Sequence, residues 1–280
     1  MQENSQKTEK RLQIIRDLLR DEGYVDIAQL VESLNVSDAT IRRDLQYLEK
    51  NEECSRKRDG AIPLLRNSRL EIPYDEKINT NKEVKKAIAK EAFDLIQDND
   101  SILLDSGSTT FALAQLLPYK EKLMVVTNDL LIAAYLAKFP HILTYMLGGN
   151  VTNQVYSVVG DLSEEFLKTC HFDRVFLGAD AIHSDGQIFN TNMQEVPLKQ
   201  AMIRAGRQII LLADSSKFKR VGFMKVCNVS DIDIVITDTN IKQSSISILE
   251  ENDVNFIKIS SRSEERRVGK ECRSRWSPYH

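Results

Sequence analysis

Residues 101–117, "SILLDSGSTTFALAQLL", join an apolar run to an amphipathic run through small and hydroxylated residues. The joining stretch consists of Asp105, Ser106, Gly107, Ser108, Thr109 and Thr110. Small residues let backbone N–H groups approach an anion, hydroxyl groups add donors, and the start of a helix favours negative charge. The stretch therefore predicts a phosphate-binding loop, and the alternative is an ordinary connection between a strand and a helix.

A second stretch, "SDATIRRDLQYLEK" at 37–50, has the pattern of a capped helix with a basic outer surface. Ser37 is a typical helix-capping residue. Three apolar residues recur at i, i+4 and i+7 and must face a core: Ile41, Leu45 and Leu48. Four residues are left on other faces: Ala39, Arg42, Arg43 and Gln46. The arginines either contact a negatively charged partner or form surface pairs with Asp38 or Glu49.

The first 64 residues contain the elements of a winged helix-turn-helix. Helical periodicity covers 7–22, 26–34 and 37–50, and "CSRKRDGAIPLL" follows with Asp59-Gly60, which favours a hairpin turn. The second helix of such a motif enters the major groove of DNA, and basic residues of the wing neutralise phosphates. The predicted DNA-binding residues are Ser37, Ala39, Thr40, Arg42, Arg43, Gln46, Arg56, Lys57 and Arg58.

The remaining chain has the pattern of an α/β domain. A linker is expected at 65–80, followed by a helix at 81–97. Apolar strands are predicted at 101–105, 123–127, 142–147, 173–178, 208–213 and 233–237, with helical stretches between them. Such alternation predicts a mostly parallel sheet within a domain at 81–260. The phosphate loop would then lie at the carboxyl end of a strand, where open sheets bind ligands.

Composition excludes several classes of protein. The 280 residues carry a formal net charge of −3, so a basic surface must come from the placement of charges. No apolar run approaches the roughly 18 residues of a membrane span, and we expect a cytoplasmic protein. Cys54, Cys170, Cys227 and Cys272 form no Cys-x-x-Cys pair, so neither a metal site nor a disulfide framework is predicted. Residues 261–280 are Arg-rich without periodicity, and we expect a non-native or disordered tail.

The stretch "VSDATIRRDLQYLE" resembles the recognition-helix signature of the DeoR family of bacterial transcriptional regulators. The resemblance extends over about residues 7–258. It implies a winged helix-turn-helix domain joined to a sensor domain that resembles ribose-phosphate isomerases. The wing departs from the family, which usually has a His-Gly-Gly-like turn after an aliphatic strand where this chain has "NEECSRKRDGAI".

The resemblance also implies further effector-binding residues in the sensor domain. They occur in "VVTNDLLIA", "LGGN", "FLGADAI", "NMQEVPLKQAMI" and "LLADSSKF", and are Asn128, Gly148, Gly149, Asp180, Glu195, Lys199 and Lys217. If these loops converge, Lys199 would hold a phosphate with the loop hydroxyls, while Asn128, Asp180 and Glu195 would contact sugar hydroxyls. Taken singly, each has a structural alternative: Asp180 can cap a turn, and Glu195 and Lys199 can form an i,i+4 surface pair.

The resemblance implies a DNA-binding transcriptional regulator, and we expect a repressor of a sugar-metabolism operon. Its partners would be a double-stranded DNA operator and a phosphorylated sugar, and it would be a homo-oligomer, dimer or tetramer, because symmetric half-sites need two recognition helices. No cofactor is expected. The alternative is a sugar-phosphate isomerase-like enzyme with an accessory DNA-binding module. The related isomerases carry an acidic residue beyond Gly-Ala-Asp, where this chain has Ala181-Ile182-His183, so we expect binding without turnover.

Overall fold

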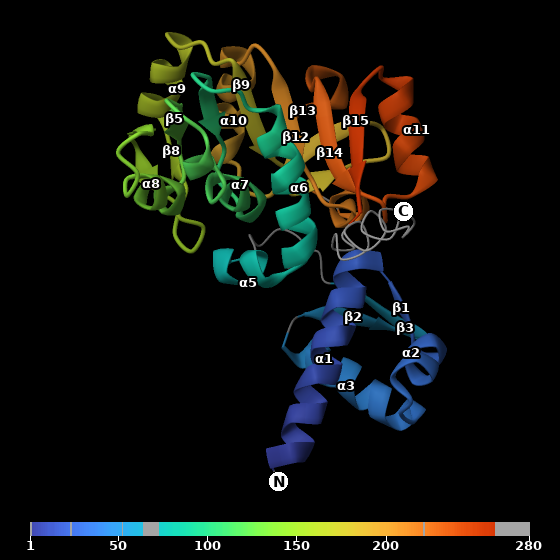
Figure 1. Cartoon of the computed structure of the whole chain (residues 1–280). Coiled ribbons are helices and arrows are strands. Elements are labelled where there is room, and N and C mark those ends of the chain that lie inside the picture. Colours follow the sequence, from blue (N-terminus) through green and yellow to red (C-terminus); the bar gives the residue numbers. More distant parts are fainter. Residues whose placement is uncertain (1, 23, 52, 64–72, 221, 261–280) are drawn as a thin grey trace, which may run out of the picture.

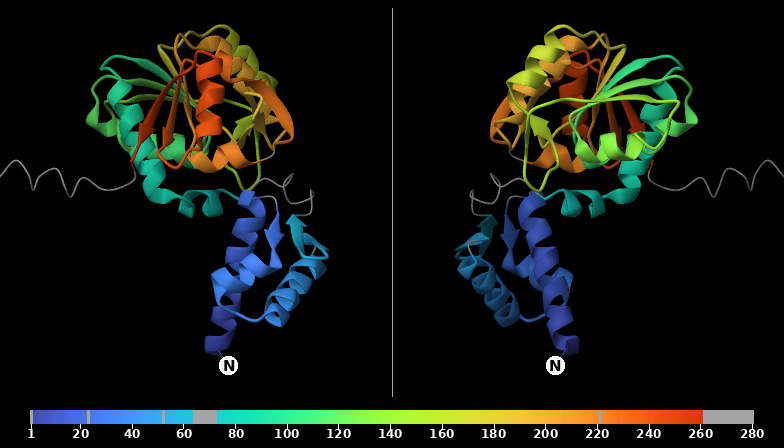
Figure 2. Two further views of the ribbon diagram at one scale, coloured as in Figure 1. Left: turned by 90° about the vertical axis from the view of Figure 1, so that its right-hand side faces the viewer. Right: turned by 90° about the vertical axis from the view of Figure 1, so that its left-hand side faces the viewer.

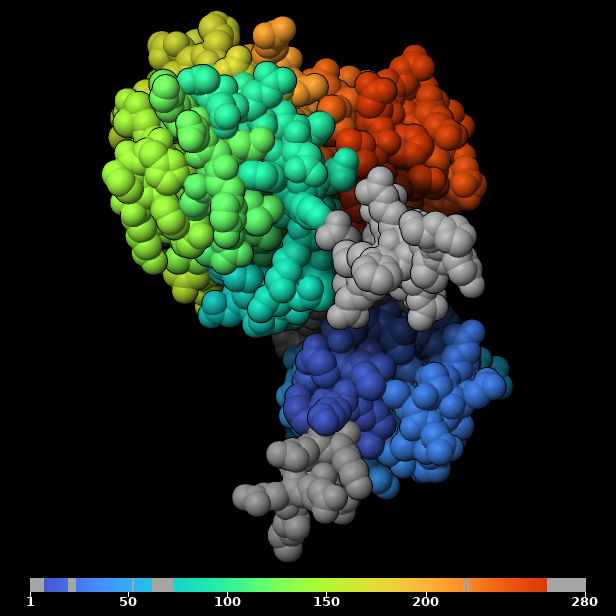
Figure 3. All heavy atoms as spheres, in the orientation of Figure 1, coloured from blue at the N-terminus to red at the C-terminus, as the bar shows by residue number. Residues whose placement is uncertain are grey.

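A computed structural model describes residues 2–22, 24–51, 53–63, 73–220 and 222–260. These residues form a small N-terminal lobe and a larger C-terminal lobe (Figures 1 and 3). The predicted tail at 261–280 and residues 64–72 of the predicted linker lie outside the described residues.

The N-terminal lobe is a winged helix-turn-helix, as predicted. Its elements are α1 (Gln2–Glu22), β1 (Val25–Asp26), α2 (Ile27–Leu34), α3 (Asp38–Lys50), β2 (Cys54–Lys57) and β3 (Gly60–Pro63). The apolar stripes of the three helices meet in one core, which includes Leu12, Ile15, Leu30, Ile41, Leu45 and Leu48. Because these residues recur at helical spacing, burial of their stripes against each other fixes the arrangement of the helices.

Local residue chemistry sets the turns of this lobe. Asn35 adopts left-handed dihedrals (φ 50°, ψ 49°) after α2, and the Ser37 hydroxyl accepts a hydrogen bond from the Thr40 N–H at the start of α3. The hairpin turn is Arg58–Asp59 rather than the predicted Asp59–Gly60, because Gly60 already pairs with β1. A Cβ atom on Gly60 would lie 2.0 Å from the Val25 carbonyl oxygen, so this close approach of the strands requires glycine.

The C-terminal lobe contains a seven-stranded sheet of order β15-β14-β12-β9-β4-β5-β6, and each neighbouring pair in it is parallel. Its strands are β4 (Ser101–Leu104), β5 (Met124–Thr127), β6 (Leu143–Met146), β9 (Arg174–Gly178), β12 (Ile209–Leu212), β14 (Ile234–Asp238) and β15 (Asn255–Ile259). The first six correspond to the six predicted strands, and the edge strand β15 was not predicted. The predicted α/β fold with a mostly parallel sheet is confirmed.

Helices cover both faces of this sheet (Figure 2). One face packs against α6 (Lys82–Leu95), α7 (Ser108–Ala114) and α8 (Leu130–Leu136). The other face packs against α9 (Asp161–Lys168), α10 (Glu195–Ala205) and α11 (Gln243–Glu251). Within β4, Ile102 and Leu104 belong to the first core and Leu103 to the second, as expected for alternating side chains in a strand that is buried on both faces.

Several smaller elements that the sequence did not predict lie in the connections between the strands of the large sheet. β10 (Ala181–Ile182), β11 (Gln187–Asn190) and β13 (Met224–Asn228) form an antiparallel sheet, and β7 (Asn150–Val151) pairs with β8 (Val158–Val159). Three 3-10 helices are η1 (Leu117–Tyr119), η2 (Ser215–Lys219) and η3 (Val229–Asp231). The predicted linker is also not wholly irregular, because α5 (Tyr74–Asn79) packs on the sensor lobe beside α7.

The order of the strands creates one natural crevice. The chain runs outward from β4 to β5 and β6, and then returns to place β9 on the other side of β4. The loops after β4 and β9 therefore diverge in opposite directions and leave a crevice between them. Open α/β sheets bind ligands in such a crevice.

Candidate functional site

A cavity of about 50 Å³ lies at the carboxyl ends of β4 and β9. This is the space of roughly three to five water molecules, at about 10–15 Å³ for each. Its lining comes from the loop after β4, the loop after β9, α5, α6, α10, β11, η2 and neighbouring residues. The lining residues are Tyr74, Lys77, Lys85, Ser106, Gly107, Ser108, Thr109, Thr110, Val155, Gly178, Ala179, Asp180, Asn190, Glu195, Lys199, Leu212 and Lys217.

Nine of the thirteen predicted effector residues line this cavity: Ser106, Gly107, Ser108, Thr109, Thr110, Asp180, Glu195, Lys199 and Lys217. Asp105, Asn128, Gly148 and Gly149 do not. Asp105 lies beneath the cavity, where its carboxylate accepts a hydrogen bond from the Gly178 N–H at 2.9 Å and pairs with Lys199. Its role is to connect β4, β9 and α10.

The other three residues outside the cavity have structural roles near β8. The buried Asn128 amide donates to the Val158 carbonyl at 3.4 Å. The Gly148 carbonyl accepts from the Ser163 hydroxyl at 2.6 Å. A Cβ atom on Gly149 would lie 2.3 Å from the Val159 carbonyl oxygen, and its φ of 148° also favours glycine. None of the three lines the cavity, and the contacts described here pack the β7–β8 hairpin; that they contact the effector stays a prediction.

The 106–110 loop presents donors to the cavity. The first turn of α7 leaves backbone N–H groups without intrahelical acceptors. The Gly107 N–H already donates to the Asp129 carboxylate at 3.2 Å, and the Thr110 hydroxyl donates to the Gly107 carbonyl at 2.9 Å. The hydroxyl groups of Ser106, Ser108 and Thr109 donate to no residue in the described part of the chain, so they remain for a ligand.

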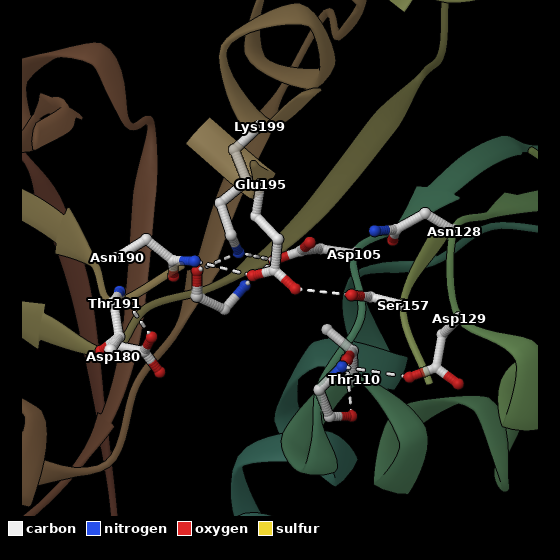
Figure 4. Close-up of polar contacts among 12 residues, drawn as sticks. Asp105, Thr110, Asn128, Asp129, Ser157, Asp180, Asn190, Thr191, Glu195 and Lys199 are labelled. Atoms are coloured by element: carbon white, nitrogen blue, oxygen red, sulfur yellow. Dashed lines mark hydrogen bonds and ion pairs between the residues drawn. The ribbon is translucent and has the colours of Figure 1, made fainter. Parts of the chain in front are cut away.

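Lys199 and Glu195 extend from the first turns of α10 toward Asp105 (Figure 4). The Lys199 ammonium contacts the Asp105 carboxylate and donates to the Gly178 carbonyl at 3.1 Å. Burial alone would lower the pKa of Lys199, but the carboxylates of Asp105 and Glu195 outweigh it and leave the pKa raised. Lys199 is therefore a buried, permanently charged group at the cavity wall.

Glu195 is held by a buried hydrogen-bond network. The Ser157 hydroxyl donates to one of its carboxylate oxygens at 2.6 Å, and the Asn190 amide donates to the other at 2.7 Å (Figure 4). Burial raises the pKa of Glu195 despite the nearby Lys199 ammonium. The network fixes Glu195 in the cavity instead of in the exposed i,i+4 pair that was the alternative interpretation.

The opposite wall carries further charges from α5, α6 and η2. Lys77 lies 3.5 Å from Asp180, whose other carboxylate oxygen accepts the Thr191 N–H at 2.9 Å. Although burial opposes it, the nearby Lys77 and Lys217 ammonium groups hold the pKa of Asp180 below its usual range. Burial, reinforced by the positive charge of Arg220, lowers the pKa of Lys217 to about 7. Burial also lowers the pKa of Lys85 to about 8.

The cavity lining thus contains four lysines and two carboxylates. Lys77, Lys85, Lys199 and Lys217 outnumber Asp180 and Glu195 in the lining, although Asp105 beneath the cavity pairs with Lys199. A negatively charged ligand would favour the protonated forms of Lys85 and Lys217, whose pKa values burial lowers. The carboxylates remain available as acceptors for hydroxyl groups. The arrangement suits a ligand that carries both a phosphate and hydroxyl groups.

Sequence reasoning missed five lining residues outside the predicted loops: Tyr74, Lys77, Lys85, Val155 and Asn190. Lys85 had a detectable signal, because it lies on the same helical stripe as Ile88, Ala89 and Ala92 and is buried with them. Asn190 belongs to the small antiparallel sheet, which has no strong pattern. His183, which follows the Gly-Ala-Asp segment, is half-buried and stacks on Phe189 at a centroid distance of 3.9 Å outside the cavity.

The predicted DNA-binding residues lie on α3 and the wing. Ala39, Arg42, Arg43 and Gln46 are exposed, as are Arg56, Lys57 and Arg58, while Thr40 is half-buried. Exposed Ser37 accepts the cap bond from Thr40. Two of the arginines form surface ion pairs in the isolated chain: Arg42 with Asp38 and Arg56 with Glu49, each at 2.6 Å. Asp44 instead faces inward and pairs with Arg11 of α1 at 2.5 Å.

Comparisons with known proteins match both lobes. A family model described as "DeoR-like helix-turn-helix domain" matches residues 11–64, and one described as "DeoR C terminal sensor domain" matches residues 80–239. The chain belongs to the DeoR family. As a DeoR-family protein it is a DNA-binding transcriptional regulator, and that prediction is confirmed.

Curated DeoR-type relatives align along nearly the whole chain. The "Putative aga operon transcriptional repressor" of Escherichia coli O157:H7 is 34% identical over 89% of this chain and 93% of its own length. The "Glycerol-3-phosphate regulon repressor" of Escherichia coli (strain K12) is 30% identical over 86% and 94%. These relatives are named as regulators, so the comparisons do not favour the isomerase alternative.

Solved structures similar to this DeoR-family chain include ribose 5-phosphate isomerase A from Methanocaldococcus jannaschii. That match has 17% sequence identity and a TM-score of 0.37, and covers 50% of this chain and 55% of the isomerase. Among the described residues, no helix is both long and apolar enough to cross a membrane.

Proposed function

We propose that this regulator is a repressor of a sugar-metabolism operon and that a phosphorylated sugar bound in the cavity controls it. The observation that carries the proposal is the 106–110 loop, whose donors face a cavity lined by four lysines. The hydroxyl groups of the loop and Lys199 would hold the phosphate. Asp180 and Glu195 would accept hydrogen bonds from sugar hydroxyls. The names of the aga operon and glycerol-3-phosphate regulon relatives support this class of effector.

The proposed DNA contact is made by α3 and the wing. Ser37, Ala39, Thr40, Arg42, Arg43 and Gln46 would face base edges and the adjoining backbone, with Arg56, Lys57 and Arg58 on phosphates. The partner would be a double-stranded operator, and a homo-oligomer, dimer or tetramer, would supply two recognition helices for symmetric half-sites. Such a regulator would act in the cytoplasm, with DNA-binding and sensor domains at 1–64 and 81–260.

The first test is thermal unfolding of the full chain with four phosphates: inorganic phosphate, glycerol 3-phosphate, fructose 1-phosphate and glucosamine 6-phosphate. The unphosphorylated counterparts of the three organic phosphates serve as controls. A ligand at about 100 times its Kd stabilises the folded state by about 2.7 kcal/mol, which corresponds to a shift of roughly 5–10 °C for a domain of this size. We expect such a shift with at least one phosphorylated compound and none with its counterpart.

A matched pair of variants tests whether the rise in unfolding temperature comes from phosphate bound at the 106–110 loop. Ser108→Asp places a negative charge in the 106–110 loop, which helix α7 tolerates at its first turn but a phosphate does not. Ser244→Asp introduces the same change at an exposed position in the first turn of α11. The shift should disappear in Ser108→Asp and persist in Ser244→Asp. Equal shifts in both variants would contradict the assignment of the phosphate to this loop.

A further inference from the structure

Tyr74, at the start of α5, is a buried residue of the cavity wall. It belongs to none of the stretches from which the effector-binding residues were predicted. Only 2% of it is exposed, and its N–H donates to the Gln154 carbonyl at 2.9 Å. Its ring packs edge-on against Phe111 and Tyr156, with centroid distances of 6.3 and 5.8 Å. These contacts fix the ring and therefore the position of its hydroxyl.

The hydroxyl group of Tyr74 is buried and has no hydrogen-bond partner among the described residues. An unpaired buried hydroxyl costs free energy, and native proteins usually satisfy such groups. Burial, together with the negative charge of Asp129, raises the pKa of Tyr74, so the phenol stays neutral and keeps both its donor and its acceptor capacity. A ligand with hydroxyl or phosphate oxygens in the same cavity would provide the missing partner.

A second side chain of α5 reaches the same cavity. Lys77 follows Tyr74 by three residues, which places both on one side of a helix. The Lys77 ammonium lies 3.5 Å from Asp180 across the cavity wall, and the buried Lys85 ammonium donates to the Lys77 carbonyl. Thus α5 is attached to the cavity through both its side chains and its backbone.

The position of α5 in the chain connects these cavity contacts to the DNA-binding domain. Tyr74 is the cavity residue nearest in sequence to the DNA-binding domain, since α5 begins just after residues 64–72, which join the two lobes. A ligand can shift a conformational equilibrium only through contacts that differ between the two states. An effector contact made by α5 acts on the element to which the DNA-binding domain is connected.

We propose that the Tyr74 hydroxyl is a direct hydrogen-bond partner of the bound effector, and that α5 transmits effector occupancy to the DNA-binding domain. This inference rests on the proposed function, because it concerns the ligand of the same cavity. It adds a ligand-binding residue from outside the strand-end loops and assigns α5 a role in regulation.

The test compares Tyr74→Phe with Tyr135→Phe in the full chain. Both changes remove one hydroxyl and keep the ring, but the Tyr135 hydroxyl donates to the Gln115 carbonyl at 3.3 Å outside the cavity. Three quantities are measured: the unfolding temperature without ligand, the affinity for each of the four phosphates named above, and the phosphate concentration that releases half of a bound DNA. The DNA is a fragment that the wild-type chain selects from a random pool.

For Tyr74→Phe we expect an unfolding temperature equal to or above that of the wild type, because the variant removes an unpaired group. Its affinity for the effector phosphate should fall about tenfold, as for one lost hydrogen bond. The concentration for half-release of DNA should rise by at least the same factor. Tyr135→Phe should bind the phosphate and release DNA as the wild type does.

Two results would overturn the inference. Unchanged phosphate affinity in Tyr74→Phe, with or without a loss of stability, would show that the hydroxyl has no ligand contact. A tenfold loss of affinity with DNA released as completely as from the wild type at saturating phosphate would refute transmission through α5, because only the coupling between the two sites reports on transmission. A wild-type chain that none of the four phosphates stabilises would instead count against the proposed function, before any variant is compared.

Discussion

The ammonium of Lys199 contacts the carboxylate of Asp105 beneath the 106–110 loop, and both side chains are almost completely buried. The pair joins α10 to the end of β4, and the Gly178 N–H joins the same carboxylate to β9. The floor of the cavity is therefore an ion pair that connects three separate elements. Its integrity matters for stability even before a ligand binds.

Removing one member of this pair should be costly. Lys199→Met leaves the Asp105 carboxylate buried without its cation, which destabilises proteins by about 3–5 kcal/mol. The double variant Asp105→Asn with Lys199→Met should lose at least about 0.5 kcal/mol less than the sum of the single changes, because the charges are removed together. Urea denaturation measures all three values.

Lys168→Met is the matched control for this prediction. Lys168 pairs with Glu165 on the exposed surface of α9, so its removal should change stability by less than about 1 kcal/mol. Equal losses in Lys168→Met and Lys199→Met would show that the buried pair contributes no more than a surface pair.

The stability of the sensor domain should depend on the protonation of Asp129. Burial raises the pKa of Asp129 to about 6, whereas an unfolded aspartate titrates near about 3.9. The folded state therefore holds this proton more tightly, and the corresponding stability is fully present below about pH 4 and is lost as the pH rises to about 6 and above. The loss amounts to about 2–3 kcal/mol.

Asp129→Asn tests this prediction. The amide oxygen can still accept from Leu131 and Ile132 at the start of α8, but it does not titrate. The difference in urea midpoint between the variant and the wild type should change between pH about 4 and about 7, with the variant relatively more stable at higher pH. Asp161→Asn, at an exposed position on α9, should give a difference that does not vary in this way.

The outward arginines of α3 should contribute to binding of every DNA sequence. Arg43 is exposed and has no ion-pair partner in the described part of the chain, whereas Arg42 pairs with Asp38. If Arg43 contacts a phosphate, Arg43→Ala should weaken non-specific binding and reduce the slope of log K against log salt by about 0.9. Fluorescence anisotropy at several salt concentrations measures both. An unchanged slope, equal to that of Lys168→Ala, would remove Arg43 from the phosphate contacts.

Among the three cysteines that the structure describes, native labelling should separate the two buried thiols from the accessible one. Burial raises the pKa of Cys54 to about 11 and that of Cys227 to about 12, and both side chains are buried. Cys170 is only partly buried. Because the thiolate is the reactive form, iodoacetamide should modify Cys170 first and the other two only on unfolding. Peptide mass spectrometry resolves the three sites, and rapid labelling of Cys54 in the native state would contradict the described core.

Most of the strands that could be predicted from the sequence are those whose residues are buried on both faces of the sheet. Ile102, Leu103 and Leu104 are all buried, so β4 is a continuous apolar run, and β9, β12 and β14 have the same character. The edge strand β6 was predicted from its apolar residue types, although Leu143 and Tyr145 are exposed. The edge strand β15, with Asn255 and Lys258 exposed, lacks such a run. β11 and β13 are short and carry polar residues, so nothing local distinguished them from loops.

The candidate site likewise has one part that could be predicted from the sequence and another part that could not. The 106–110 loop could be predicted because its residue types are adjacent in sequence. Tyr74 and Lys77 belong to a six-residue helix after a proline, which is too short for a periodic pattern, and only tertiary packing brings them to the cavity. Asn128, Gly148 and Gly149 also follow strands, but those strands, β5 and β6, lie on the other side of β4 from β9, and the three residues do not line the cavity.

The crevice between β4 and β9 also bears on how such regulators diversify. The side chains that surround the cavity come from several connections, while the buried strands below them determine the sheet. On the proposed function, substitutions in one connection would alter which metabolite binds without disturbing the packing of the core, so the specificity of the sensor could change separately from the fold.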